Sequence, residues 1–186
     1  MSEVSAAVEP QGVGRERRWL PVVIVTALIV VVAGGARTFA DATAGSTGPI
    51  ALGSVRVQPQ PGWQVEGSVQ PSAVRLHRGP VVLDVFAGRS FPGGPSALAA
   101  IYLNQQLIPA FARIVPSNFD PALVVDGAPA VSFTYVGVTG DGVGIEGIVV
   151  AADTTDASVV FDAKAPKGEL GASIEDIRAM IDGAVV

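Results

Sequence analysis

The sequence contains no cysteine and only one histidine, His77, in 186 residues. Without cysteine the chain can have neither a disulfide framework nor a lipid-modified cysteine anchor. Without cysteine or a second histidine, the usual zinc ligand sets are also missing. A catalytic histidine needs an orienting partner, and no such partner is indicated for His77. We therefore interpret His77 as a surface or groove residue, and we expect stability to come from packing.

Charge is also sparse, at 16% of residues, and it is acidic on balance. From Arg37 onward the chain has nine Lys and Arg residues against fourteen Asp and Glu residues, and they are dispersed. Proteins that bind nucleic acid carry clustered positive charge. The composition therefore excludes nucleic acid as a partner.

The chain has one long uncharged run, the 17 residues from Leu20 to Ala36. As a helix this run extends about 25 Å, and Trp19 at its start adds to the length, so that it can span a bilayer. We expect a transmembrane helix over residues 19–36, a disordered tail over 1–18 and a flexible spacer over 37–49.

Arginines indicate the orientation of this span. Arg15, Arg17 and Arg18 precede the run, while only Arg37 follows it. Because positive charge is retained in the cytoplasm, the N-terminus should lie inside and residues 50–186 outside.

A cleavable signal peptide is the alternative interpretation of the same run. Ala40-Asp41-Ala42 would serve as its cleavage site. The apolar run is longer than usual for a signal peptide, and Arg37 lies between the run and that site, so we favour an uncleaved anchor. Either outcome leaves the same domain, residues 50–186, on the same side of the membrane.

Two hairpins are predicted in this domain. The first covers residues 73–88 and turns at Gly79-Pro80, which places Arg75 opposite Asp84. The second turns at Gly140-Asp141-Gly142, because Asp-Gly is a strong turn signal. Apolar residues on both of its faces predict a sheet that is covered on both sides. One face is expected to hold Phe133, Tyr135, Ile148 and Val150, and the other Val136, Val138, Ile145 and Val149.

Two helices complete the α+β pattern, one inserted between the hairpins and one at the end of the chain. The first is expected to have Ser96 as its N-cap and to kink or end near Leu107 or Ile108, before Pro109. The second begins with Ser173 and Asp176 in an arrangement that resembles a capping box. Its apolar stripe consists of Ile174, Ile177, Met180 and Ile181.

The motifs that could carry chemistry are weak. The G-x-G-x-x-G pattern at 142–147 follows a hairpin tip instead of joining a strand to a helix, so we interpret it as turn and bulge glycines. Asp141, Asp153 and Asp156 lie at predicted hairpin tips and lack the spacing of a calcium loop. The sequence around Ser90 lacks the second glycine of a nucleophile elbow.

Two further features have a structural interpretation. Glu146 and Asp162 are carboxylates that could meet in space, but their strand positions favour solvated side chains. Trp63 follows a Pro-Gly turn at the first strands, which favours a core anchor over a partner contact. No residue is therefore predicted to be catalytic, to bind a cofactor or to bind a metal.

The segments "PQPGWQVEGS", "VRLHRGPVVLDVFAG", "GAPAVSFTYVG", "SVVFDAKAP" and "SIEDIRAMIDGAVV" together resemble the PsbP-like fold. The resemblance covers about Val55 to Val186 and rests on motifs of low specificity. Proteins with this fold include exported actinobacterial proteins of the LpqN and LpqT type. The resemblance implies an α/β/α sandwich around an antiparallel sheet that binds protein partners or small hydrophobic molecules and shares no catalytic residues. The lipidated cysteine of the lipoprotein members is absent here.

The expected function is a non-enzymatic interaction module, anchored outside the cytoplasmic membrane, that assists a cell-envelope or secretion complex. An alternative is a carrier or sensor in which the sheet and the helix from Ser96 to Ala112 enclose an envelope lipid or glycan. An enzyme is a third option, which would need two acidic groups converging in a cleft.

Overall fold

The computed structural model describes residues 48–67 and 70–186. The described residues belong to one compact unit, Asp41–Val186. The predicted tail, span and cleavage site, and most of the predicted spacer, lie outside them. Within the described part of the chain, no helix has the length and apolar character needed to cross a membrane.

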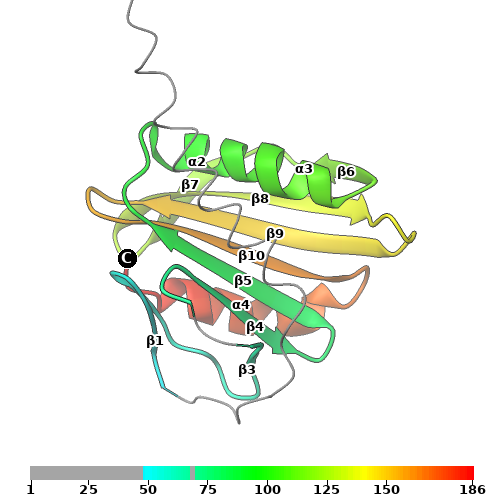
Figure 1. Cartoon of the computed structure of the whole chain (residues 1–186), viewed down its shortest axis with the longest axis horizontal. Helices are drawn as coiled ribbons and strands as arrows, with labels where there is room; N and C mark the ends of the chain where they lie inside the picture. The colour runs from blue at the N-terminus through cyan, green and yellow to red at the C-terminus, as the bar shows by residue number, and fades with distance from the viewer. Residues whose placement is uncertain (1–47, 68–69) are drawn as a thin grey trace, which may run out of the picture. The chain divides into compact units, whose positions relative to one another are not determined.

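An eight-stranded antiparallel sheet forms the centre of this unit, in the order β3-β4-β5-β10-β9-β8-β6, with β7 also paired to β8 (Figure 1). Two short strands, β1 (Ile50–Leu52) and β2 (Val55–Val57), form a separate antiparallel pair. The strands of the large sheet are β3 (Gln64–Val65), β4 (Ala73–Arg78), β5 (Val81–Gly88), β6 (Arg113–Pro116), β7 (Asp120–Val125), β8 (Ala128–Val138), β9 (Gly144–Asp153) and β10 (Ser158–Pro166).

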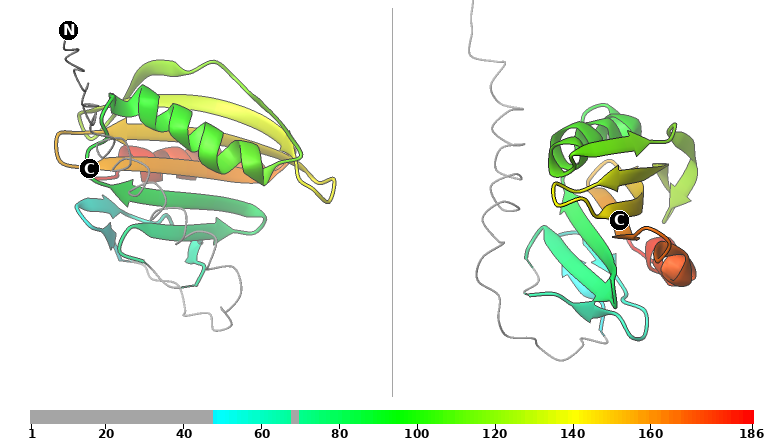
Figure 2. Two further views of the ribbon diagram at one scale, coloured as in Figure 1. Left: turned by 45° about the horizontal axis from the view of Figure 1, so that its top comes forward. Right: turned by 90° about the vertical axis from the view of Figure 1, so that its right-hand side faces the viewer.

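Helices lie on both faces of the sheet (Figure 2). One face carries α2 (Gly94–Tyr102), the π-helical turn η3 (Leu103–Leu107) and α3 (Ile108–Ala110). The other carries the 3-10 turn η4 (Leu170–Ser173) and α4 (Ile174–Asp182). We call these the α2 face and the α4 face. The layered α+β arrangement agrees with the predicted fold class.

The N-terminus of α2 differs from the prediction. The N-cap is Gly93, with a φ of 111°, and Pro95 occupies the first turn, so Ser96 as N-cap is wrong. Proline suits the first turn because its missing N–H has no partner there, and glycine tolerates the positive φ before it.

The predicted disruption near Leu107 takes the form of the π-helical turn before Pro109. The N–H of Ile108 bonds to the carbonyl of Leu103, five residues back, and the chain becomes extended at Phe111. The wider turn allows Tyr102 and Leu107, five residues apart, both to be buried.

The first hairpin has the predicted register, with Arg75 opposite Asp84 and Leu76 opposite Leu83. The second hairpin turns where predicted, but the faces assigned to its second strand are wrong by one residue. Phe133 lies opposite Val149 and Tyr135 opposite Gly147, so Ile148 and Val150 face the other side. A shift of one residue moves every side chain of a strand to the opposite face.

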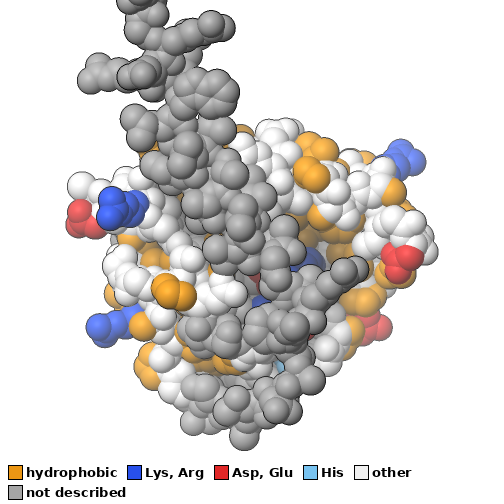
Figure 3. Space-filling model, viewed as in Figure 1, with side chains coloured by type: hydrophobic (Ala, Val, Ile, Leu, Met, Phe, Trp, Pro, Cys, Tyr) orange, Lys and Arg blue, Asp and Glu red, His pale blue; other side chains and the backbone are white. Residues whose placement is uncertain are grey.

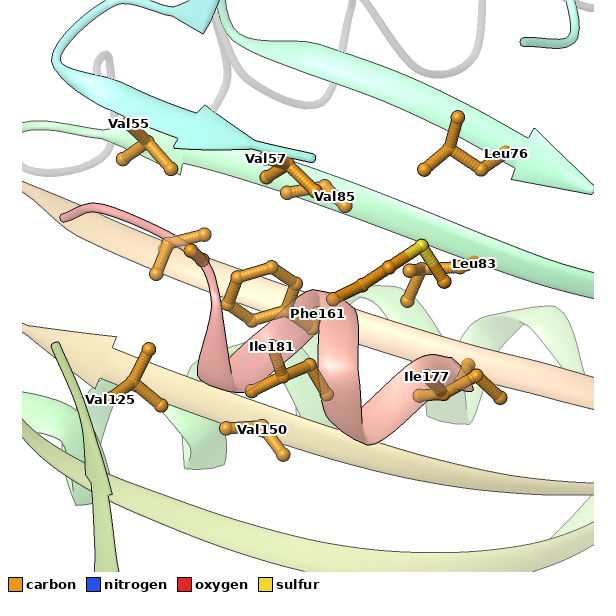
Figure 4. Packing of buried hydrophobic residues seen from close by; sticks show 14 of the residues in the cluster. Val55, Val57, Leu76, Leu83, Val85, Val125, Val150, Phe161, Ile177 and Ile181 are labelled. Carbon is orange, nitrogen blue, oxygen red and sulfur yellow. The ribbon is translucent and has the colours of Figure 1, made fainter. Parts of the chain in front are cut away.

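The core on the α4 face is mostly aliphatic, with Phe161 and Trp63 as its aromatic members. Phe161 of β10 lies beneath Ile177 and Ile181 of α4, with Val55 and Val57 of β2 beside them (Figure 4). Ile177, Met180 and Ile181 are buried, as the predicted apolar stripe requires. The predicted core anchor is confirmed, because Trp63 is only 4% exposed.

Arg78 joins the tip of the first hairpin to the start of α4. Its guanidinium pairs with Asp176, donates to Ser173 Oγ at 3.0 Å and to Ala172 O at 3.2 Å, and lies 5.6 Å from the centroid of the Trp63 ring. The predicted capping box is wrong, because Ser173 makes no side-chain cap bond and Arg78 engages both of its members.

Replacing Arg78 with alanine should destabilise the domain by about 1–2 kcal/mol, because the partly exposed ion pair, the hydrogen bonds and the ring contact are lost together. R178A is the matched control, since Arg178 forms only an exposed pair with Glu175. Chemical denaturation followed by circular dichroism measures both variants. Equal effects would contradict the role given to Arg78.

Candidate functional site

Two buried carboxylates project from the sheet on its α2 face. Asp84 of β5 is 4% exposed and Asp162 of β10 is 0% exposed, and they are direct cross-strand neighbours. The prediction of a solvated Asp162 is therefore wrong. Like charges placed opposite each other destabilise a sheet, so both carboxylates need cationic partners.

Lys164 and Arg75 supply the positive charge. Lys164 Nζ lies 2.7 Å from Asp84 Oδ2 and 3.0 Å from Asp162 Oδ2, so that one ammonium bridges both carboxylates. Arg75 donates to Asp84 through Nε at 2.6 Å and Nη2 at 3.0 Å, as its predicted register position allows. Two cations thus balance two carboxylates, in bidentate and bridging geometry.

Two tyrosines complete the coordination of Asp162. Tyr102 of α2 donates its hydroxyl to Oδ2 at 2.9 Å, and Tyr135 of β8 donates to Oδ1 at 2.8 Å. The Tyr102 bond ties α2 to the sheet. We call Arg75, Asp84, Tyr102, Tyr135, Asp162 and Lys164 the Asp162 network.

Gly147 makes room for the ring of Tyr135. It lies opposite Tyr135 on β9, and a Cβ at Gly147 would stand 2.3 Å from Tyr135 Cζ. Any side chain there would displace the ring and remove its hydroxyl from Asp162. The last glycine of the G-x-G-x-x-G pattern is thus a packing glycine within a regularly paired strand, so its interpretation as a turn or bulge glycine is wrong.

The charges of the network are mutually stabilised. Burial by itself would raise the pKa of Asp84, but the hydrogen bonds from Arg75 and the charge of Lys164 bring this pKa below its usual value. Burial by itself would lower the pKa of Lys164, but the charges of Asp162 and Asp84 raise it above the usual value. Burial and the neighbouring charge of Asp162 raise the pKa values of both Tyr102 and Tyr135.

These protonation states decide what the network can do chemically. Lys164 stays charged and the two tyrosines stay neutral at physiological pH, so none of them is activated as a nucleophile or general base. The half-exposed side chain of Arg75 and part of Lys164 reach the surface, whereas Asp162 does not. The arrangement is suited to holding α2 in place.

The other residues singled out from the sequence are not part of this network. Glu146 points to the α4 face, where its Oε1 accepts the N–H groups of Gly168 and Leu170 at 3.0 Å each, so it does not meet Asp162. His77 is half-buried on β4, on the face opposite Leu76, as predicted. Asp153 accepts the Phe91 N–H at 2.8 Å.

No metal cluster is evident in the described parts of the chain. Residues 48–67 and 70–186 contain no group of three or more histidine, aspartate or glutamate side chains that could hold a metal ion. On the face shown in Figure 3, several coloured charged side chains stand at the rim, and a few blue and red ones lie near the centre.

Most of the network was not predicted from the sequence. Tyr102 and Lys164 were not singled out, Tyr135 was expected only as a member of one hairpin face, and only the Arg75–Asp84 pair was expected. The available signal was a lone aspartate within each of two strongly apolar strands, "VVLDVFAG" and "SVVFDAKAP". A carboxylate at such a position is expected to be buried and to require partners.

Comparison of the sequence with protein-family models gives no match, and comparison with curated proteins gives none either. Solved structures do match. Cyanobacterial PsbP from Synechocystis has a TM-score of 0.55 and 11% identity, over 81% of this chain and 98% of that one.

Two further structures have the same fold. LpqN, described as involved in cell envelope biogenesis of Mycobacterium tuberculosis, has a TM-score of 0.53 and 9% identity, over 74% of this chain and 88% of that one. A point mutant of the protein Mog1 has a TM-score of 0.52 and 11% identity, over 76% and 96%. The domain therefore has the PsbP-like fold and resembles LpqN-type proteins in structure.

Removing the two tyrosine hydroxyls should have unequal effects. Y135F leaves Asp162 Oδ1 without a partner and should cost about 2–3 kcal/mol, whereas Y102F should cost about 1–2 kcal/mol because Oδ2 keeps Lys164. Chemical denaturation of the two variants, which match in chemistry, measures this difference. A larger loss in Y102F would contradict the assigned geometry.

Stability should also depend on pH through Asp84. Because its pKa is lower in the folded protein than the usual 3.8, its contribution is present above about pH 4 and is lost as the pH falls through the folded pKa. D84N should cost about 3 kcal/mol at neutral pH and lose less additional stability between about pH 5 and pH 3 than the parent protein. Chemical denaturation across this pH range tests the contribution of Asp84, and E175Q, at an exposed carboxylate, is the control. Parallel profiles for D84N and the parent would refute the assignment.

Proposed function

We propose that this chain is a non-catalytic interaction module of the cell envelope, anchored by residues 19–36 in the cytoplasmic membrane with residues 50–186 outside. It assists an envelope or secretion complex through protein contacts. The observation that carries the proposal is the PsbP-like fold, which is shared with LpqN, a protein of cell envelope biogenesis.

The Asp162 network supports the non-catalytic part of the proposal. Its hydrogen bonds are directed inward, and its lysine and tyrosines are held in unreactive protonation states. Glu146 and Asp162 lie on opposite faces of the sheet and do not converge. Asp84 and Asp162 do meet, but both are buried and Lys164 bridges them.

The alternative of an enclosed lipid or glycan between the sheet and the first helix has less support. That space is filled by the buried core of the α2 face, in which Ala99, Tyr102 and Leu107 pack on Phe133 and Tyr135. A ligand could enter there only if this packing opened.

The absence of native cysteine makes the topology directly testable. We expect S54C, in the exposed turn between β1 and β2, to react with a membrane-impermeant maleimide on intact spheroplasts. S5C, in the N-terminal tail, should react only after lysis. The mass of the labelled membrane-bound chain reports whether it is cleaved near Ala42. Labelling of S5C without lysis, or protection of S54C, would refute the proposed orientation.

Crosslinking of the full chain in membranes, followed by pull-down, tests the interaction part. Envelope proteins should be recovered with the full chain and not with a tagged control that contains only residues 1–49. Recovery of the chain alone would count against an interaction module.

A further inference from the structure

Part of the α4 face is open. The core beneath α4 and β2 fills this face over β4, β5, β10, part of β9 and the beginning of β8. Further along the sheet, Val115, Val136 and Val138 are 52%, 50% and 39% exposed, and Val115 lies directly opposite Val136. Adjacent exposed valines form an apolar surface, which in soluble proteins often marks a binding site.

Val115 and Val136 line a groove of about 400 Å³, a volume within the range of ligand pockets, and Val138 lies outside its lining. Its lining comes from β6, β8 and β9, and Leu170 of η4 also contributes to it. The groove therefore crosses the strands instead of following the sheet edge, and an extended peptide added to β6 would not lie along it.

The polar side chains of the lining are largely engaged already. Ser117 Oγ donates to Asn118 O at 2.9 Å and accepts the Thr134 N–H at 3.0 Å. Glu146 accepts two backbone N–H groups, and the Tyr135 hydroxyl is bound to Asp162 on the opposite face. The exposed Thr134 hydroxyl is the remaining polar side-chain group of the lining. A peptide backbone needs hydrogen-bond partners, whereas a hydrocarbon chain needs none. The lining thus favours a hydrocarbon occupant.

Two cations flank one end of the groove. Arg113 lies opposite Val138, Val138 opposite Gly144, and the backbone of Lys167 bonds to Gly144. Lys167 points to the groove side, because its Cβ is 3.8 Å from the position of a Cβ at Gly144. Across three strand spacings, the Cα atoms of Arg113 and Lys167 are about 14 Å apart, within joint reach of two long side chains.

The charges around this end favour a negative group between the two cations. Within the described residues, neither the Arg113 nor the Lys167 side chain has an ion pair or a hydrogen bond. Among the nearby acids, Glu146 is engaged by backbone N–H groups and Asp141 by Thr139, while Glu169 is exposed.

We propose that this groove binds a single-chain anionic lipid. Its hydrocarbon chain lies across Val136 and Val115 toward Leu170, and its head group lies between Arg113 and Lys167. The inference rests on the proposed function, because only a domain held near a membrane meets such lipids routinely.

Photo-crosslinking of the full chain in phosphatidylcholine nanodiscs tests this, with dodecanoate carrying a terminal diazirine as the probe. Peptide mapping should place the adducts in residues 113–117, 134–138 and 167–171. R113Q/K167Q should lower the yield at least about tenfold, because each cation contributes about a fivefold factor toward an anionic lipid head. V136D should also abolish labelling, whereas V124D, at an even more exposed valine outside the groove, should not.

Equal labelling by the corresponding dodecanol probe would refute the anionic head group. Adducts scattered over the domain, or an equal loss in V124D, would refute the groove. Protection of the groove by a crosslinked protein would identify a different occupant and overturn the lipid proposal while leaving the interaction module in place. An error in the proposed membrane orientation would be detected separately, by the maleimide labelling of S5C and S54C.

Discussion

A buried carboxylate that must be neutralised organises this domain. Asp162 is completely buried on β10, and its two oxygens accept hydrogen bonds from Lys164 on the same strand, Tyr102 on α2 and Tyr135 on β8. An unpaired charge at this position would cost several kcal/mol, so the partners are required by the burial itself. Through these bonds the carboxylate fixes the position of α2 relative to the sheet.

The two faces of the sheet are completed differently. On the α2 face, the helix, the aromatic core and the Asp162 network close the interior. On the α4 face, α4 and β2 complete a mostly aliphatic core that includes Phe161 and Trp63, but Val115 and Val136 are exposed. A binding role is therefore better placed on the open part of the α4 face than in the space beneath α2, where the side chains are already packed together.

Much of the fold follows from local pattern. The register of the first hairpin, the tip of the second, the core position of Trp63 and the buried stripe of α4 agree with prediction. The cap of α2 and the faces of β9 do not. Gly93 and Pro95 form a different start for the helix. Alternation predicts the face of each side chain in β9 only when the pairing register of the strand is assigned correctly.

The sequence by itself determined the acidic balance, the lack of cysteine, and much of the strand and helix pattern, because each depends on composition or on residues close in the chain. Tertiary structure decided the burial of Asp162, since its tyrosine partners lie 27 and 60 residues away in the chain. It also decided why position 147 must be glycine, since the ring of Tyr135 occupies the space of a side chain there. Such constraints arise only when strands distant in the sequence are brought side by side, so periodicity within one strand does not predict them.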